Sequence, residues 1–316
     1  MKRTILFTII LLEHIVILGQ RVPNQAENMD YLVLFGKDAL PASGDDDHVQ
    51  ILFFTVPQAQ SAPVYIRIYD PDTGGLHDEQ TNVANTKCRY SVYGGEKAFS
   101  QKESRYTDPI GEYKSGNILA TRIFGDEKNY DNKWFTLGPF NPTEGELVEE
   151  MGGRVFKVII EGLTGDDGNA YRLFLSVSAS ENISVQGGNA FAFEYTVKLP
   201  KNKGTSHIYP FVSNQVISVT QNNFDFDQDG QIMIYSIAKN RHAAAVSGDN
   251  VWASSKHPLQ DEEKNTTIDI QLLKTSNTDN TVSFYVTNQY NEALPFFAIP
   301  LGGAPTFDYK LSIKYR

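Results

Sequence analysis

The sequence predicts an all-β protein built from two tandem antiparallel β-sandwich domains that follow a signal peptide. Three observations carry this prediction. Most segments alternate apolar and polar residues with a period of two, and clusters of Gly, Asn, Asp and Pro separate these segments. Beyond the first 20 residues, no segment has a convincing helical period. One buried face and one solvated face are typical of antiparallel sheets packed as sandwiches.

The first 20 residues have the features of an export signal. Lys2 and Arg3 form a charged start, an apolar stretch continues to Leu18, and Gly19 supplies a small residue for cleavage. A membrane anchor is the alternative, but Glu13 leaves the apolar run short of the roughly 20 residues that a spanning helix needs. We therefore expect a mature chain without a transmembrane segment that is secreted, extracellular or periplasmic.

The first domain is expected to span residues 21–200, with eight strands up to residue 178 and the strand-like segment FAFEYTVK after them. In VYIRIY, for example, Val64, Ile66 and Ile68 share one face of the strand. YRLFLSV and the later FAFEYTVK alternate in the same way. The eight expected strands lie near residues 31–36, 49–56, 63–69, 83–93, 116–124, 133–137, 154–162 and 170–178.

A polar stretch, LPKNKGTSH at residues 199–207, is the clearest candidate for a linker because it carries Pro200 and Gly204. It divides the first domain from a second sandwich at residues 201–316, where TVSFYVT and YKLSIKY alternate. The one helix expected in the mature chain is a turn or two within GELVEEM, residues 145–151.

The composition limits both the means of stabilisation and the partners. The single cysteine, Cys88, excludes a disulfide within the chain, so stability must come from hydrophobic cores, with bound metal as a further means. Cys88 lies in the strand-like TKCRYSVY and is interpreted as a packed side chain. The formal net charge of -10 argues against nucleic acid or an anionic membrane as the main partner.

Acidic loops are predicted to meet at one end of the first domain. Successive strands of a meander alternate in direction, so every second loop emerges at the same end. The loops at residues 37–48, 70–82, 125–132 and 163–169 share that end and are rich in Asp. Asp, Asn and Gly are also the ordinary turn residues of any all-β protein. Several acidic loops at one rim nevertheless favour calcium, which takes six to eight oxygen ligands. The candidate calcium ligands of this rim are Asp45, Asp47, Asp70, Asp72, Asp166 and Asp167.

The stretch NNFDFDQDGQIMIYS, residues 222–236, supplies a second candidate calcium site. Its candidate ligands are Asp225, Asp227, Asp229 and the carbonyl of Gln231. The spacing opens an EF-hand loop, yet Ser236 stands at the twelfth position, where an EF-hand has Glu. We expect a hairpin loop here, in which Gly230 allows the chain to reverse its direction sharply. The missing acid would be supplied by folding, either from Asp249 or from Asp261, Glu262 or Glu263.

The stretch VYIRIYDPDTGG, residues 64–75, resembles the strand and turn of small sandwich modules appended to secreted bacterial peptidases. A sandwich with Asp-rich loops at one rim is also similar to the calcium-dependent lipid-binding sandwich of the synaptotagmin kind. The resemblance covers about the first domain only, and these modules are shorter than residues 21–200. It implies an accessory or binding role rather than catalysis.

No catalytic motif stands out in the sequence. There is no G-x-S-x-G elbow, no H-E-x-x-H helix and no glycine-rich phosphate loop. The sequence therefore favours a calcium-stabilised binding or adhesion module, secreted or on the cell envelope, whose partner is a protein or glycan surface. A carbohydrate-binding or carbohydrate-active protein is the first alternative, and it requires aromatic residues in a cleft beside paired carboxylates. A structural subunit of a secreted or envelope assembly is the second alternative.

Overall fold

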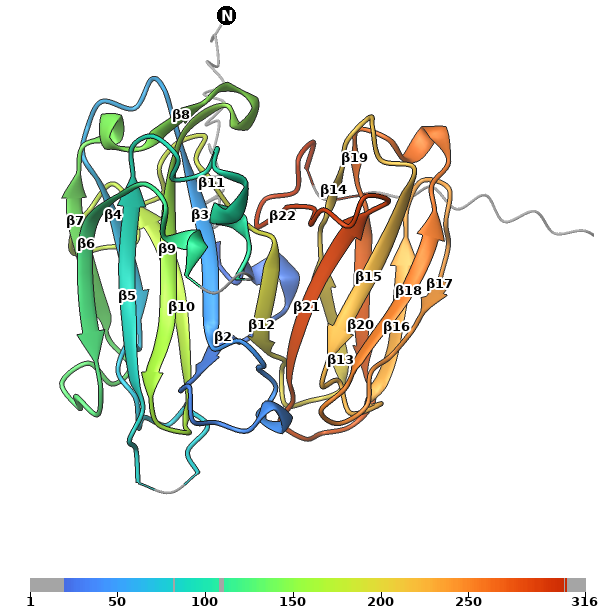
Figure 1. The fold of residues 1–316 in the computed structure, drawn as a ribbon, viewed down its shortest axis with the longest axis horizontal. Helices are drawn as coiled ribbons and strands as arrows, with labels where there is room; N and C mark the ends of the chain where they lie inside the picture. The colour runs from blue at the N-terminus through green and yellow to red at the C-terminus, as the bar shows by residue number, and fades with distance from the viewer. Residues whose placement is uncertain (1–19, 82, 108–110, 304, 306–316) are drawn as a thin grey trace, which may run out of the picture.

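The computed structural model describes residues 20–81, 83–107, 111–303 and 305, and over these residues the protein is all-β, as expected (Figure 1). The expected signal peptide, apart from Gln20, and the expected strand in YKLSIKY lie outside the described residues. In the described part, helical structure is confined to short 3-10 turns, and no helix is long and apolar enough to cross a membrane. These turns are η1 (Gln25–Glu27), η2 (Pro41–Ser43), η3 (Lys102–Arg105), η4 (Glu112–Lys114), η5 (Pro142–Glu144), η6 (Glu149–Met151) and η7 (Asp261–Glu263).

The largest sheet has nine strands, all paired antiparallel, and runs through both halves of the chain. Its strands, in spatial order, are β18 (Trp252–Pro258), β15 (Ser218–Phe224), β21 (Thr281–Asn288), β12 (Glu194–Lys198), β2 (Tyr31–Phe35), β10 (Gly168–Ser176), β4 (Val64–Tyr69) and β7 (Trp134–Phe140), with β1 (Arg21–Val22) also paired to β10.

A second, seven-stranded sheet covers the part of the large sheet that is formed by β2, β10, β4 and β7. Its strands are β22 (Phe296–Phe297), β11 (Asn189–Ala192), β3 (Val49–Pro57), β9 (Gly153–Thr164), β5 (Lys87–Gly94) and β6 (Asn117–Phe124), with β8 (Glu146–Val148) paired to β9. Alternate apolar residues of the two sheets, such as Ile66, Ile68 and Val158, form one buried core between them. Cys88 belongs to this core, and burial raises the pKa of its thiol to about 12, consistent with a packed side chain.

Smaller sheets complete the second half of the molecule. Ile232, Ile270 and Leu272 of the four-stranded sheet share a buried core with Phe284 and Val286 of β21. The four strands are β13 (Gly204–Ile208), β20 (Asp269–Lys274), β16 (Gly230–Tyr235) and β17 (His242–Ala244), and a separate pair consists of β14 (Phe211–Val212) and β19 (Thr266–Thr267). Both halves therefore bury apolar residues between facing sheets.

All eight strands expected in residues 31–178 are present, with ends shifted by a few residues. The helix expected at residues 145–151 is wrong. Residues 146–148 form β8, which pairs with β9, and only the single 3-10 turn η6 follows. Tertiary pairing overrides the local preference here. The Glu146 carboxylate also accepts hydrogen bonds from the backbone N–H groups of Phe99 (2.5 Å) and Ser100 (3.0 Å), which fixes a neighbouring loop.

The segment FAFEYTVK changes sheets in its middle. Residues 189–192 form β11 of the seven-stranded sheet, and residues 194–198 form β12 of the nine-stranded sheet, so Phe193 is the crossover. β12 then pairs with β2 on one side and with β21 on the other (Figure 1). The large sheet thus continues past the expected linker, of which residues 204–207 already belong to β13.

The acidic loops of the first half do meet at one end of the sandwich, the lower end in Figure 1. The N–H of Gly165 donates to Asp38 Oδ2 (2.9 Å), and the N–H of Thr81 donates to Asp167 Oδ1 (3.0 Å). The loops keep their alternation between the two ends because the described residues between β5 and β6 contain 3-10 turns and no strand.

Candidate metal centres

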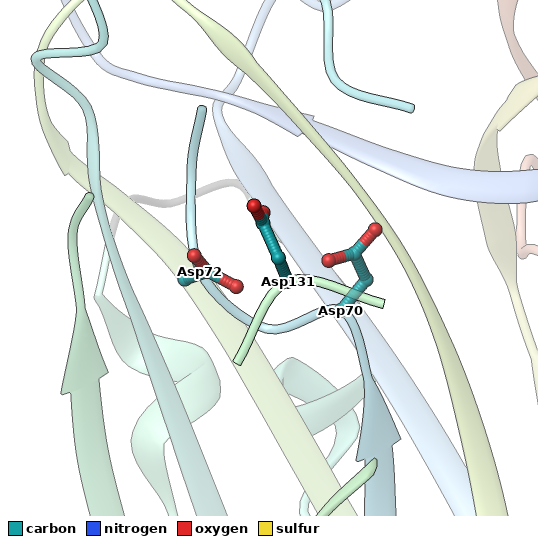
Figure 2. Close-up of side chains that lie close together, drawn as sticks. All are labelled: Asp70, Asp72 and Asp131. Atoms are coloured by element: carbon teal, nitrogen blue, oxygen red, sulfur yellow. The ribbon is translucent and has the colours of Figure 1, made fainter. Parts of the chain in front are cut away.

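Three carboxylates gather where β4 ends and where the β6–β7 loop returns. Asp70 and Asp72 follow β4 directly, and Asp131 lies three residues before β7. One oxygen of each carboxylate lies within 4.8 Å of the others. Figure 2 shows Asp70 and Asp72 on one loop, with Asp131 from the neighbouring loop between them. We call this group the rim cluster.

Backbone contacts hold the two loops of the rim cluster together. Asp70 has a positive φ of 56°, its N–H donates to Lys133 O (2.9 Å), and its Oδ1 accepts from the N–H of Asn132 (2.8 Å). A Cβ at Gly75 would lie 2.6 Å from Oδ1 of Asp131, so the Asp131 carboxylate would have to shift if Gly75 were replaced. The second glycine of DPDTGG therefore leaves space for the third carboxylate of the cluster.

Burial makes the rim cluster unusual. Asp70 is 0% exposed and Asp72 is 1% exposed. Both carboxylate oxygens of Asp72 and Oδ2 of Asp70 are buried without a hydrogen-bond partner among the described residues. A buried carboxylate without a partner is strongly unfavourable, since it loses hydration and gains nothing in return. Native proteins rarely tolerate such groups unless something else satisfies them.

The electrostatics of the rim cluster agree with its burial. Desolvation, followed by repulsion from Asp131 and Asp70, raises the pKa of Asp72 to about 7. The pKa of Asp78 is also raised to about 7, because burial outweighs the hydrogen bonds that its carboxylate accepts from the N–H groups of Ala170, Gly74 and Gly75. The carboxyl groups of Asp70, Asp72, Asp78 and Asp131 lie at the same rim. Their combined negative potential attracts a cation.

The other rim residues expected from the sequence have different roles. Asp167 is fully buried and accepts hydrogen bonds from the backbone N–H groups of Thr81, Asn85 and Thr86, so it joins loops. Asp166 accepts from Asn85 Nδ2 (2.8 Å) at the surface. Neither belongs to the rim cluster.

Asp45 and Asp47 also lie outside the rim cluster. Oδ1 of Asp45 accepts from the N–H groups of Asp47 (3.2 Å) and His48 (3.1 Å), and Oδ1 of Asp47 accepts from the N–H of Val49 (2.9 Å). Burial raises the pKa of Asp45 to about 6, and burial together with repulsion from Asp45 raises the pKa of Asp47 to about 7. Asp45 is buried, whereas Asp47 lines a cleft between the halves of the molecule.

A second group of acids, which we call the turn cluster, consists of Asp225, Asp227 and Asp249. One oxygen of each lies within 4.8 Å of the others. Asp225 (φ 61°) and Asp227 (φ 54°) are both left-handed, so this segment is a coiled turn rather than an extended strand. Oδ1 of Asp225 accepts from the N–H of Asn250 (2.6 Å), which brings the loop of Asp249 to the site. Burial is the main cause that raises the pKa of Asp225 to about 6.

One expected ligand of the second site, Asp229, points elsewhere. Asp229 Oδ1 accepts from the N–H of Ser276 (2.8 Å) and its Oδ2 accepts from the hydroxyl of Ser276 (2.5 Å), so it holds the β20–β21 turn. Gln231 is an exposed residue of β16 and lies opposite Leu273 of β20. Gly230 is needed for close packing, since a Cβ there would lie 2.0 Å from Leu273 O.

The structure therefore brings together Asp70 with Asp72, and Asp225 with Asp227, and completes each pair with an acid from another loop. The parity of the loops predicts the end at which Asp131 lies, and Asp249 is one of the four acids that the sequence offers for the second site. All six side chains offer only oxygen, and either cluster could hold a metal ion. No protein-family model matches this chain, and no curated protein is significantly similar to it.

Proposed function

We propose that the protein is a calcium-stabilised binding or adhesion module, secreted or held in the cell envelope, that acts without catalysis. One observation carries the calcium part of the proposal: both oxygens of the buried Asp72 carboxylate lack a partner among the described residues, beside Asp70 and Asp131. A divalent cation would satisfy these oxygens and cancel the repulsion between the three charges.

The donor set favours calcium over other metals. Both clusters consist of carboxylates, which suit hard cations, whereas zinc and copper sites usually include His or Cys. Calcium takes six to eight oxygens in flexible geometry, and carbonyl groups and water can complete the shell around loops of this kind. Magnesium demands a smaller octahedral shell, so it is the weaker fit.

Calcium would stabilise the fold by joining neighbouring loops. The rim cluster joins the end of β4 to the loop before β7, and the turn cluster joins the β15–β16 turn to the loop before β18. An ion that binds only the native state adds about 2.7 kcal/mol when its free concentration is 100 times its Kd. For a chain of this size that corresponds to a rise in Tm of roughly 5 °C.

Thermal melting of the chain from residue 20 tests this proposal. We expect calcium to raise Tm relative to chelator, and magnesium to do so less at equal concentration. Asp72→Asn should remove the part of the calcium shift that belongs to the rim cluster. Asp166→Asn is the matched control, because Asp166 is an acid of the same rim whose contact to Asn85 an amide oxygen preserves. Identical melting curves in calcium and in chelator would refute the calcium proposal.

The location outside the cytoplasm has its own test. Fractionation of the native host should place the protein outside the cytoplasm, with a mature N-terminus near residue 20. Recovery of the intact first 20 residues on a cytoplasmic protein would contradict the export part of the proposal.

Carbohydrate binding is the second candidate function, and a specific feature favours it. Trp252 and Tyr285 line one cleft together with the carboxylates of Asp47 and Glu194. Aromatic rings beside carboxylates are what a carbohydrate-binding or carbohydrate-active protein would need. Titration with neutral oligosaccharides, followed by a hydrolysis assay, tests this candidate.

A further inference from the structure

The cleft between the two halves of the molecule has a volume of about 440 Å³. It is lined by segments that are far apart in the sequence. The β2–β3 loop contributes Asp46 and Asp47, and the start of β12 contributes Glu194. The second half of the molecule contributes Trp252 of β18 and Tyr285 of β21. The sheet crossover at residue 193 is what places Glu194 beside the second half.

The aromatic wall of the cleft is held in place although it is partly open to solvent. Trp252 is 36% exposed, yet its ring centroid lies 5.1 Å from that of Tyr285 and 5.2 Å from that of Phe224. Its indole Nε1 donates to Asp46 Oδ2 (2.8 Å), a contact between the two halves. Tyr285 is the direct cross-strand neighbour of Glu194. The rings and the carboxylates therefore form one fixed surface.

The charges of the cleft are not balanced within the protein. Among the described residues, the Glu194 carboxylate accepts no hydrogen bond and joins no ion pair, and burial and the neighbouring aspartates raise its pKa well above the usual range. Of the described residues that line the cleft, Arg105 is the one cationic residue. Its guanidinium stacks over Phe99 (4.1 Å to the centroid), its Nε donates to Phe99 O (3.3 Å), and no described carboxylate forms an ion pair with it. Three acids thus face the cleft without a paired cation.

A bare metal ion does not fit this arrangement. Within the described ranges, three acidic groups come within 4.8 Å of one another only in the rim cluster and the turn cluster. The three carboxylates of the cleft therefore do not converge on one ion position as those of the two clusters do. A larger ligand that carries positive charge can reach them and also cover the rings, since cations are attracted to aromatic faces and N–H donors form strong hydrogen bonds with carboxylates.

We propose that this cleft binds an organic cation, a guanidinium or primary ammonium group presented by an Arg or Lys side chain of a protein or peptide partner. The carboxylates of Asp47 and Glu194 accept its N–H groups, and Trp252 and Tyr285 cover its apolar stem. This inference rests on the proposed binding role and supplies its ligand class, but it does not depend on calcium.

Two tryptophans make the test direct, because Trp252 lies in the cleft and Trp134 lies on β7 in the other half. The full chain from residue 20 is titrated with N-acetylated, C-amidated Gly-Arg-Gly and with the same blocked peptide carrying citrulline in place of arginine. Blocking the termini leaves the guanidinium as the one charged group that distinguishes the peptides, and the two indole N–H resonances are followed by NMR. Trp134→Phe assigns the signals. We expect the arginine peptide to shift the Trp252 signal alone and the citrulline peptide to shift neither signal.

Variants separate the role of charge from a change in shape. Glu194→Gln should weaken binding of the arginine peptide at least tenfold, because a charge-assisted hydrogen bond is lost. Asp47→Asn should act in the same direction and serves as the second variant if Glu194→Gln fails to fold. Glu181→Gln is the matched control, since Glu181 is exposed on a loop outside the cleft lining.

Three results would overturn the inference: equal shifts with both peptides, no shift with either at millimolar concentration, or a Trp252 shift with neutral oligosaccharide alone. The last result would favour the second candidate function. All titrations are performed in calcium and in chelator. A calcium-dependent Tm with no peptide binding would refute the cleft proposal only, and peptide binding without any calcium effect would refute the calcium proposal only.

Discussion

The Asp72→Asn substitution should change the stability of the protein in opposite directions with and without calcium. In the metal-free protein the pKa of Asp72 is raised from 3.8 to about 7. The stability that this group contributes is therefore fully present below pH 3.8 and is lost as pH rises through about 7. The shift of roughly three pH units corresponds to about 4 kcal/mol at pH 8, because each unit is worth 1.36 kcal/mol.

Asparagine removes this penalty, since it carries no charge at any pH. In chelator at pH 8 we expect Asp72→Asn to raise the free energy of unfolding by up to about 4 kcal/mol, or Tm by up to roughly 8 °C. When free calcium exceeds about 1,000 times Kd, the ion stabilises the wild type by more than about 4 kcal/mol. The variant has lost a charged ligand and gains less, so the order of the two melting curves should reverse. Differential scanning calorimetry at pH 8 measures both cases.

The outcome that would refute this reasoning is specific. If Asp72→Asn lowers Tm in chelator, the carboxylate is already satisfied in the folded protein and the unpaired oxygens are not a source of strain. If the calcium-induced rise in Tm is the same in wild type and variant, Asp72 is not a ligand.

Three further predictions follow from the same geometry. Calcium affinity should fall as pH drops below about 7, because protons compete for the buried carboxyls of the rim. Calorimetric titration at pH 6, 7 and 8 measures the affinity, and a Kd that does not change with pH would contradict this prediction. Asp227→Ala should reduce the calcium-dependent part of Tm, whereas Asp229→Ala should lower Tm by the same amount in calcium and in chelator, because Asp229 holds a turn. Gly75→Ala should lower calcium affinity, since its Cβ would displace Asp131; an unchanged Kd would argue against Asp131 as a ligand.

Much of the fold could be predicted because period-two alternation encodes the strands directly. The strands from residue 31 to residue 178 and the shared end of the acidic loops follow from alternation and parity alone. The sheet crossover at Phe193 could not be predicted, since FAFEYTVK alternates without interruption while its two halves join different sheets. Alternation reports which face of a strand is buried, and it carries no information about which sheet the strand joins.

The candidate sites were predictable to the level of loops and not of side chains. Spacing suggested that Asp225, Asp227 and Asp229 converge, which assumes an extended backbone. The left-handed φ of Asp225 and Asp227 redirects the chain, so Asp229 turns to Ser276 instead. Asp tolerates that conformation through local hydrogen bonds, and the sequence does not specify which Asp adopts it.

The pairing of β12 with β21 means that the large sheet cannot be completed until the later part of the chain has been synthesised. Thr196 and Ser283, which face each other across this pair, are 87 residues apart in the sequence. Until β21 has been synthesised, the first half ends in an open strand edge at β12, and open edges recruit other chains into aggregates. A nascent or truncated chain that stops near residue 200 would therefore be at risk of aggregation. For the export that we propose, final assembly of this sheet would follow the crossing of the membrane, because β12 and β21 can pair only when both have emerged.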